Sequence, residues 1–131
     1  MNRLSAVISS IDQYESLFML ELDASGITLE MLLFDLQPFF RTGSSVQVLF
    51  KETEVALAKG LAEETSFSNI FPAIITAIKK GRILAEISLQ SKAGSMGSII
   101  TMKAAMRLGL QIHDEVTVLV KASQLSLEAL P

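Results

Sequence analysis

The sequence predicts a mainly β protein built from two tandem five-stranded barrels, each with one short helix. Two observations support this prediction. Short apolar runs separated by turn residues recur along the chain, which is typical of small all-β domains. In addition, two separate blocks of sequence occur twice, in the same order. The chain has 131 residues, which is enough for two very small domains or for one of ordinary size.

The duplication is visible in two pairs of segments. Residues 2–11 match residues 69–78 at an offset of 67, with identical Asn, Ala and final Ile residues and coinciding apolar positions. Residues 46–53 match residues 116–123 at an offset of 70. Two collinear matches at nearly the same offset indicate a tandem duplication with a few residues gained in the second copy.

The second copy, expected over residues 64–131, contains the clearer pattern. Met102–Leu108 combines good helix formers and is followed by Gly109, which predicts a two-turn helix closed by a glycine C-cap. The glycine of Lys79-Lys80-Gly81 predicts a turn with a positive φ, and the glycine- and serine-rich residues 90–97 predict a loop. Alternating and β-branched residues predict strands at residues 72–78, 82–89, 98–101, 116–121 and 125–127.

The first copy, expected over residues 1–63, follows the same order. Asp23-Ala24-Ser25-Gly26 predicts a tight hairpin turn. Residues 33–40 correspond to the helix, but Pro38 predicts a looser turn there. Residues 58–64 predict a short linker or a single helical turn between the copies. Strands are expected at residues 4–11, 17–22, 27–32 and 46–51. Five strands with a helix between the third and the fourth is the order of an OB-like barrel.

Composition excludes several classes of function. The chain has no cysteine, so disulfides and thiolate sites are excluded, and a lone His113 cannot form a metal cluster with other histidines. A net charge of −3 and a shortage of Trp and Tyr argue against a nucleic-acid-binding surface. No carboxylate pair, nucleophile–base set or phosphate loop stands out, so we expect a protein that is not an enzyme.

Half of the residues are hydrophobic, yet no window approaches the roughly 18 apolar residues that cross a bilayer. The N-terminal residues also lack the continuous apolar stretch of a signal peptide. We therefore expect a cytoplasmic protein that does not bind membranes. Two small barrels cannot bury so much apolar surface alone, which predicts a homo-oligomer.

Each repeated apolar run ends on a lysine, with a small hydroxyl residue two positions later. The pairs are Lys51 with Thr53 and Lys121 with Ser123. Such a strand end can complete a small anion site. Alternatively, it is a core strand that reaches the surface, with the lysine side chain extending to water.

These motifs resemble those of the molybdate-binding Mop domain, the TOBE-like module of the molbindins. The stretch Thr65-Ser66-Phe67-Ser68-Asn69 is similar to the family's opening motif Thr-Ser-Ala-Arg-Asn. The stretch Val120-Lys121-Ala122-Ser123 is similar to its closing motif Val-Lys-Ala-Ser. Residues 100–110 look like the family's strand, helix and Leu-Gly-Leu segment. The resemblance covers essentially the whole chain as two tandem copies.

The resemblance implies paired OB-like barrels that bind molybdate or tungstate for intracellular storage, buffering or homeostasis. It implies oligomers with oxyanion sites between subunits, and no organic cofactor and no metal ligand set in the protein. Carried over onto this chain, it implies nine oxyanion-binding positions: Ser66, the main chain at Phe67, Ser68, Thr101, Lys121, Ala122 and Ser123, with Lys51 and Thr53 from the first copy.

The chain departs from the family pattern at several positions. Ser68 stands where the family has arginine, and Ala104 stands where several members have serine. Glu52 replaces a small neutral residue beside Lys51, and the first copy retains only Asn2 of the opening motif.

The chemistry of such a site can be stated independently of the family. Molybdate is a tetrahedral dianion, which N–H groups, hydroxyls and one or two cations can bind, and a lysine contact is the strongest of these. The alternative for the serines is solvation of a linker and local turn bonds. A ligand-free regulatory or interaction module and a nucleic-acid-binding OB module therefore remain as alternative functions.

Overall fold

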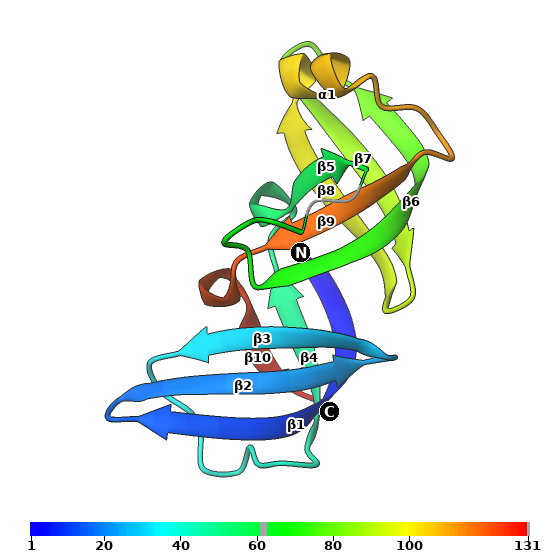
Figure 1. Ribbon diagram of the computed structural model, residues 1–131. Helices are drawn as coiled ribbons and strands as arrows, with labels where there is room; N and C mark the ends of the chain where they lie inside the picture. Colours follow the sequence, from blue (N-terminus) through cyan, green and yellow to red (C-terminus); the bar gives the residue numbers. More distant parts are fainter. Residues whose placement is uncertain (61–62, 131) are drawn as a thin grey trace.

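The computed structural model describes residues 1–60 and 63–130, which form two lobes, each built on a five-stranded antiparallel sheet (Figure 1). The predicted fold class, two tandem OB-like units, is confirmed. The strands of the first half are β1 (Asn2–Tyr14), β2 (Leu17–Ala24), β3 (Ile27–Leu33), β4 (Ser45–Phe50) and β5 (Ala56–Lys59). Those of the second half are β6 (Asn69–Lys80), β7 (Leu84–Ser91), β8 (Gly94–Thr101), β9 (Glu115–Val120) and β10 (Ser126–Ala129).

The last strand of each half belongs to the sheet of the other half. One sheet has the order β10-β4-β1-β2-β3 and the other has the order β5-β9-β6-β7-β8. In Figure 1, β10 lies beside β4 in the lower lobe and β5 lies beside β9 in the upper lobe. The expected linker over residues 58–64 is therefore wrong at its start, because Ala58 and Lys59 belong to β5. Leu61 and Ala62 of that segment lie outside the described residues.

The duplication extends to irregular details of the backbone. The long first strand of each half pairs with two neighbours, β1 with β2 and β4, and β6 with β7 and β9. Both strands change register between equivalent positions, Ile8/Ser10 in β1 and Ile75/Ala77 in β6. A bulge bends a strand and increases its twist, so each first strand can curve around its lobe. This curvature encloses a core of alternating buried residues such as Ile8, Leu20 and Val48 in one lobe and Ile75, Ile87 and Val118 in the other.

The helix prediction is confirmed in the second half. Helix α1 (Met102–Leu108) ends at Gly109, whose φ of 60° is the left-handed conformation expected of a glycine C-cap. The segment around Pro38 forms no helix, as the proline predicts. The short helix of the first half is instead the 3₁₀ helix η1 (Glu52–Glu54), which has an equivalent in η2 (Ala122–Gln124).

Two predictions for the second half are wrong. Residues 90–97 are not a loop, because β7 continues to Ser91 and β8 starts at Gly94. Gly94 and Gly97 of β8 let the two lobes approach closely, because a Cβ atom at Gly94 would contact Leu4 and one at Gly97 would contact Glu52. Gly81 does not have the predicted positive φ. A glycine is needed there because a Cβ atom would lie 2.8 Å from the main-chain oxygen of Leu84.

Candidate functional site

A cavity of about 500 Å³ lies where the two halves of the chain meet. It combines η1 and the start of β5 from the first half with β8, α1 and η2 from the second half. The lining residues are Thr53, Glu54, Val55, Ala56, Phe67, Leu84, Ile99, Ile100, Thr101, Ala104, Lys121 and Gln124. The strand exchange creates this cavity, because η1 packs against β8 of the other half.

Four of the nine predicted oxyanion-binding residues line this cavity: Thr53, Phe67, Thr101 and Lys121. They come from four separate segments of the chain. The structure thus brings Lys121 together with Thr53 of the other copy, whereas the sequence motif groups Lys121 with Ser123. The remaining five predicted residues do not line it: Lys51, Ser66, Ser68, Ala122 and Ser123.

Lys121 supplies the positive charge of the cavity. Its main-chain N–H donates to the Oε1 atom of Gln124 at 3.3 Å, which fixes the backbone at the start of η2. The side chain is exposed, and within residues 1–60 and 63–130 its ammonium takes part in no hydrogen bond or ion pair. Three N–H donors are therefore available to a bound anion.

The hydroxyl of Thr101 is also able to donate. Its Oγ1 atom accepts a hydrogen bond from the main-chain N–H of Ala104 at 3.1 Å, which caps α1. A hydroxyl that accepts one bond keeps its own O–H donor, so Thr101 can contact an anion without releasing its cap. Thr53 is exposed on η1 and adds a second hydroxyl.

The opening motif contributes less than expected. The main-chain N–H of Phe67, predicted as a donor to the anion, donates instead to Oγ1 of Thr65 at 3.1 Å. Phe67 lines the cavity with a half-buried side chain, while Ser66 and Ser68 are exposed outside it. Ala122 is buried and can offer only main-chain atoms.

The last residue of the opening motif, Asn69, has a structural role. It is fully buried, and its side-chain amide accepts from the N–H of Glu30 at 2.8 Å and donates to the C=O of Glu30 at 3.0 Å. Asn2, its counterpart in the first copy, makes the same pair of bonds to Gly97 at 2.8 and 2.9 Å. Each asparagine therefore joins its own half to the edge strand of the other half.

Sequence reasoning missed two polar residues of the cavity, Glu54 and Gln124. Oε1 of Glu54 accepts from the main-chain N–H of Lys51 at 2.9 Å, which is the contact that Gln124 makes with Lys121. The two residues are related by the repeat offset of 70. Extending the lysine motif by one more position would have found them.

Glu52 lies outside the cavity but beside Lys51. Its carboxylate pairs with the N-terminal amine of Met1 at 2.8 Å. This hydrogen bond, together with one from the main chain, lowers the pKa of Glu52 below its ordinary value. Glu52 therefore stays ionised, with its charge balanced by the amine.

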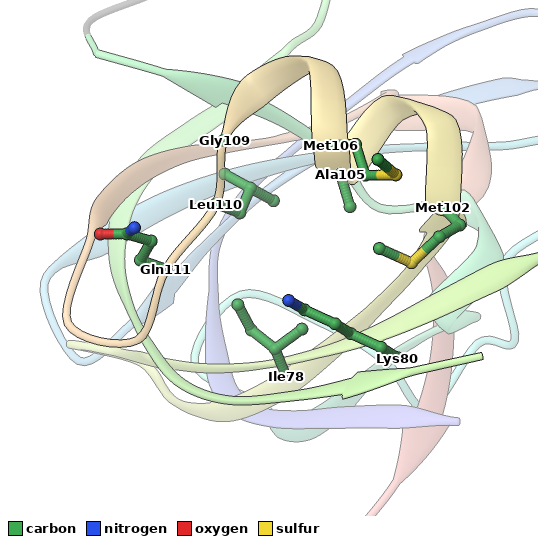
Figure 2. Close-up of a pocket in the computed structure, with 8 residues that line it drawn as sticks. All are labelled: Ile78, Lys80, Met102, Ala105, Met106, Gly109, Leu110 and Gln111. Carbon is green, nitrogen blue, oxygen red and sulfur yellow. The ribbon is translucent and has the colours of Figure 1, made fainter. Parts of the chain in front are cut away.

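A second cavity, of about 260 Å³, lies between α1 and β6 (Figure 2). Its walls are mostly apolar, including Ile78, Met102 and Leu110, and Lys80 and Gln111 are its polar side chains. Figure 2 shows Lys80 extending from β6 along this apolar space. None of the predicted oxyanion-binding residues lies here, and no hydroxyl accompanies the lysine.

The part of the chain that the structure describes contains no cluster of three or more His, Cys, Asp or Glu residues that could hold a metal ion. Within the same residues, no helix has the length and the apolar character needed to span a membrane.

Comparisons with known proteins agree with this architecture. Residues 65–127 match the TOBE domain model. The chain is 25% identical over 120 residues to the molybdenum import ATP-binding proteins ModC of Brucella abortus (strain 2308), Brucella suis biovar 1 and Brucella melitensis biotype 1. The match covers 91% of this chain but 32% of those proteins, so the chain spans about a third of their length.

The fold of the whole chain is found in a solved structure. The cytoplasmic molybdate-binding protein ModG, crystallised with molybdate bound, superposes with a TM-score of 0.88 at 22% identity. The superposition covers 98% of this chain and 96% of ModG. It therefore includes both lobes, and the chain as a whole has the two-lobed fold of ModG. Together with the match of residues 65–127 to the TOBE domain model, this confirms the resemblance that the sequence predicted.

Proposed function

We propose that this protein binds molybdate, or the closely similar tungstate, in the cavity between its two halves and acts as an intracellular store or buffer of the oxyanion. The observation that carries the proposal is the meeting of Lys121, Thr53 and Thr101 in one cavity from segments far apart in the sequence. The likeness to ModG, and to about a third of the length of the ModC relatives, supports the same ligand class. A binding protein of this kind needs no catalytic group.

The donor set suits a tetrahedral dianion. Lys121 offers a cation with no competing carboxylate contact among the described residues, and two hydroxyls lie in the same cavity. Charge-assisted hydrogen bonds of this type are roughly twice as strong as neutral ones. The cavity is larger than one oxyanion needs, and much of its wall is apolar, including Phe67, Leu84 and Ile99.

The open apolar wall supports a homo-oligomer. Leu84 of the cavity is exposed, as are Phe34, Phe39 and Ile83 elsewhere. A second copy packed over this surface would bury apolar area and exclude water from the anion, with sites between subunits as the resemblance implies. Sedimentation and native mass spectrometry, each with and without molybdate, measure the assembly and its number of bound anions.

The direct test is calorimetric titration with molybdate, tungstate and sulfate. Lys121→Met should weaken molybdate binding roughly ten- to a hundred-fold, because a charge-assisted bond contributes about 1.5–3 kcal/mol. Lys51→Met should have a smaller effect, since Lys51 does not line the cavity. Lys92→Met, in the β7–β8 turn at the far end of the hairpin from Thr101, removes the same charge and serves as the control.

Thermal melts of all variants separate binding from folding. Equal binding by Lys121→Met and the parent protein would mean that the lysine is only a solvated strand end. If the parent protein binds none of the three anions at millimolar concentration, the oxyanion function is refuted, and a ligand-free interaction module takes its place.

A further inference from the structure

Two equivalent residues of the repeat line the same cavity and differ in one chemical respect. Glu54 carries a carboxyl group where Gln124 carries an amide. Both side chains are held in the same way, because Oε1 of each accepts the main-chain N–H of the lysine three residues earlier. The cavity therefore holds a carboxyl group and an amide group at equivalent positions of the repeat.

The second polar atom of each side chain, which these contacts do not use, differs between the two residues. Among the described residues, Oε2 of Glu54 and Nε2 of Gln124 have no hydrogen-bond partner. The amide nitrogen is a donor and can contact an anion directly. An ionised carboxylate only accepts hydrogen bonds and repels an anion, whereas a protonated one gains an O–H donor.

We propose that Glu54 couples oxyanion binding in this cavity to the uptake of one proton. When a tetrahedral dianion enters, the Glu54 carboxylate takes a proton from solvent onto Oε2, and the new O–H donates to the anion while Oε1 keeps its bond to Lys51. Glu54 then contacts the anion as Gln124 does at any pH. This inference rests on the proposed function of the cavity and adds a reason for the anion to be released as pH rises.

The described residues that line the cavity include one carboxyl group, that of Glu54. Lys121 shares the cavity, and its ammonium has no carboxylate partner among the described residues. On its own element, Glu52 is paired with the Met1 amine and Lys51 precedes the helix. Strand β8, which packs against η1, carries no titratable side chain, and the charged residues of α1 are the cations Lys103 and Arg107.

The test is molybdate titration of the full chain by calorimetry between about pH 5 and pH 8. The parent protein should bind more tightly as pH falls, approaching tenfold per pH unit for one coupled proton. Glu54→Gln should bind about tenfold more tightly at neutral pH and should lose the pH dependence. Gln124→Glu should weaken neutral-pH binding and steepen the pH dependence. Glu21→Gln, an exposed neutralisation on β2, should behave as the parent protein does.

The outcomes separate this inference from the proposed function. Glu54→Gln keeps the Oε1 contact with Lys51, so its thermal melt should match that of the parent protein. Binding by both proteins with the same pH dependence would overturn the role of Glu54 and leave the oxyanion function intact, because the proton would then be on the ligand. Absence of binding by every variant at every pH would overturn both.

Discussion

At the scale of single residues, the two buried asparagines show how a motif can carry architecture rather than ligand chemistry. Asn2 and Asn69 occupy equivalent positions, and each satisfies the N–H and the C=O of one residue in the other half. A buried peptide group must find such partners because water cannot reach it. The match between residues 2 and 69 indicated the repeat, but the sequence had no means of showing which strand each asparagine contacts.

Asn69→Ala should destabilise the fold strongly. The substitution removes the partner of the main-chain N–H and C=O groups of Glu30, which the fully buried Asn69 side chain contacts. Each unsatisfied group costs about 1–3 kcal/mol. We expect a loss of about 2–4 kcal/mol in the free energy of unfolding, measured by urea denaturation. Gln13→Ala, which removes an exposed local bond, is the control. A loss no larger than that of the control would show that the bridge to Glu30 is not formed.

At the scale of elements, the sequence predicted those whose formation depends on neighbouring residues in the chain. The helix at Met102–Leu108 was predictable because its composition and Gly109 specify both its body and its end. Strand β8 was missed at Gly94–Gly97 because its small residues suit a close approach to the other lobe; Gly94, for example, lies against the Leu4 side chain. Strand β5 was missed because four residues of weak pattern become a strand only when β9 of the other half is beside them.

The same limit explains why the sequence did not predict which candidate site residues lie together. Lys121, Thr53 and Thr101 are predicted site residues that line one cavity, but the motif paired Lys121 with Ser123 two residues away. The strand exchange decides which hydroxyl lies near which lysine. The exchange depends on how both halves pair, so the sequence pattern of one repeat does not predict it.

Strand β5 should stabilise α1 through Lys59. The Lys59 ammonium donates to the main-chain oxygens of Leu108 and Gly109, both at 3.1 Å, and lies 3.5 Å from Asp114. A cation at a helix C-terminus contributes about 0.3–1 kcal/mol when exposed, so Lys59→Met should lower stability by that amount. Lys79→Met, which disrupts only a surface pair with Glu86, should change the melting temperature less. Equal melting temperatures for the two variants would argue against this cap.

At the scale of the whole molecule, the strand exchange makes the two sheets differ from the two repeats in sequence. The division into residues 1–63 and 64–131 remains a prediction about the two repeats in sequence. In space, each sheet takes its outer strand from the other half, β10 on β4 and β5 on β9. The cavity with Lys121 and Thr53 exists only where these exchanged segments meet. Folding of both sheets and formation of the site are thus expected to be one cooperative event.

A chain cut between Glu63 and Glu64 should therefore stay together under native conditions. Each half retains its own four-stranded sheet but depends on the other for the fifth strand and for an asparagine bridge, and unpaired edge strands favour reassociation. After cleavage at an engineered protease site, native mass spectrometry should detect both fragments in one complex that still binds molybdate. In denaturant the fragments should separate, and mixing them on dilution should restore binding. Two folded, independent fragments that separate in native buffer would show that the sheets do not share strands.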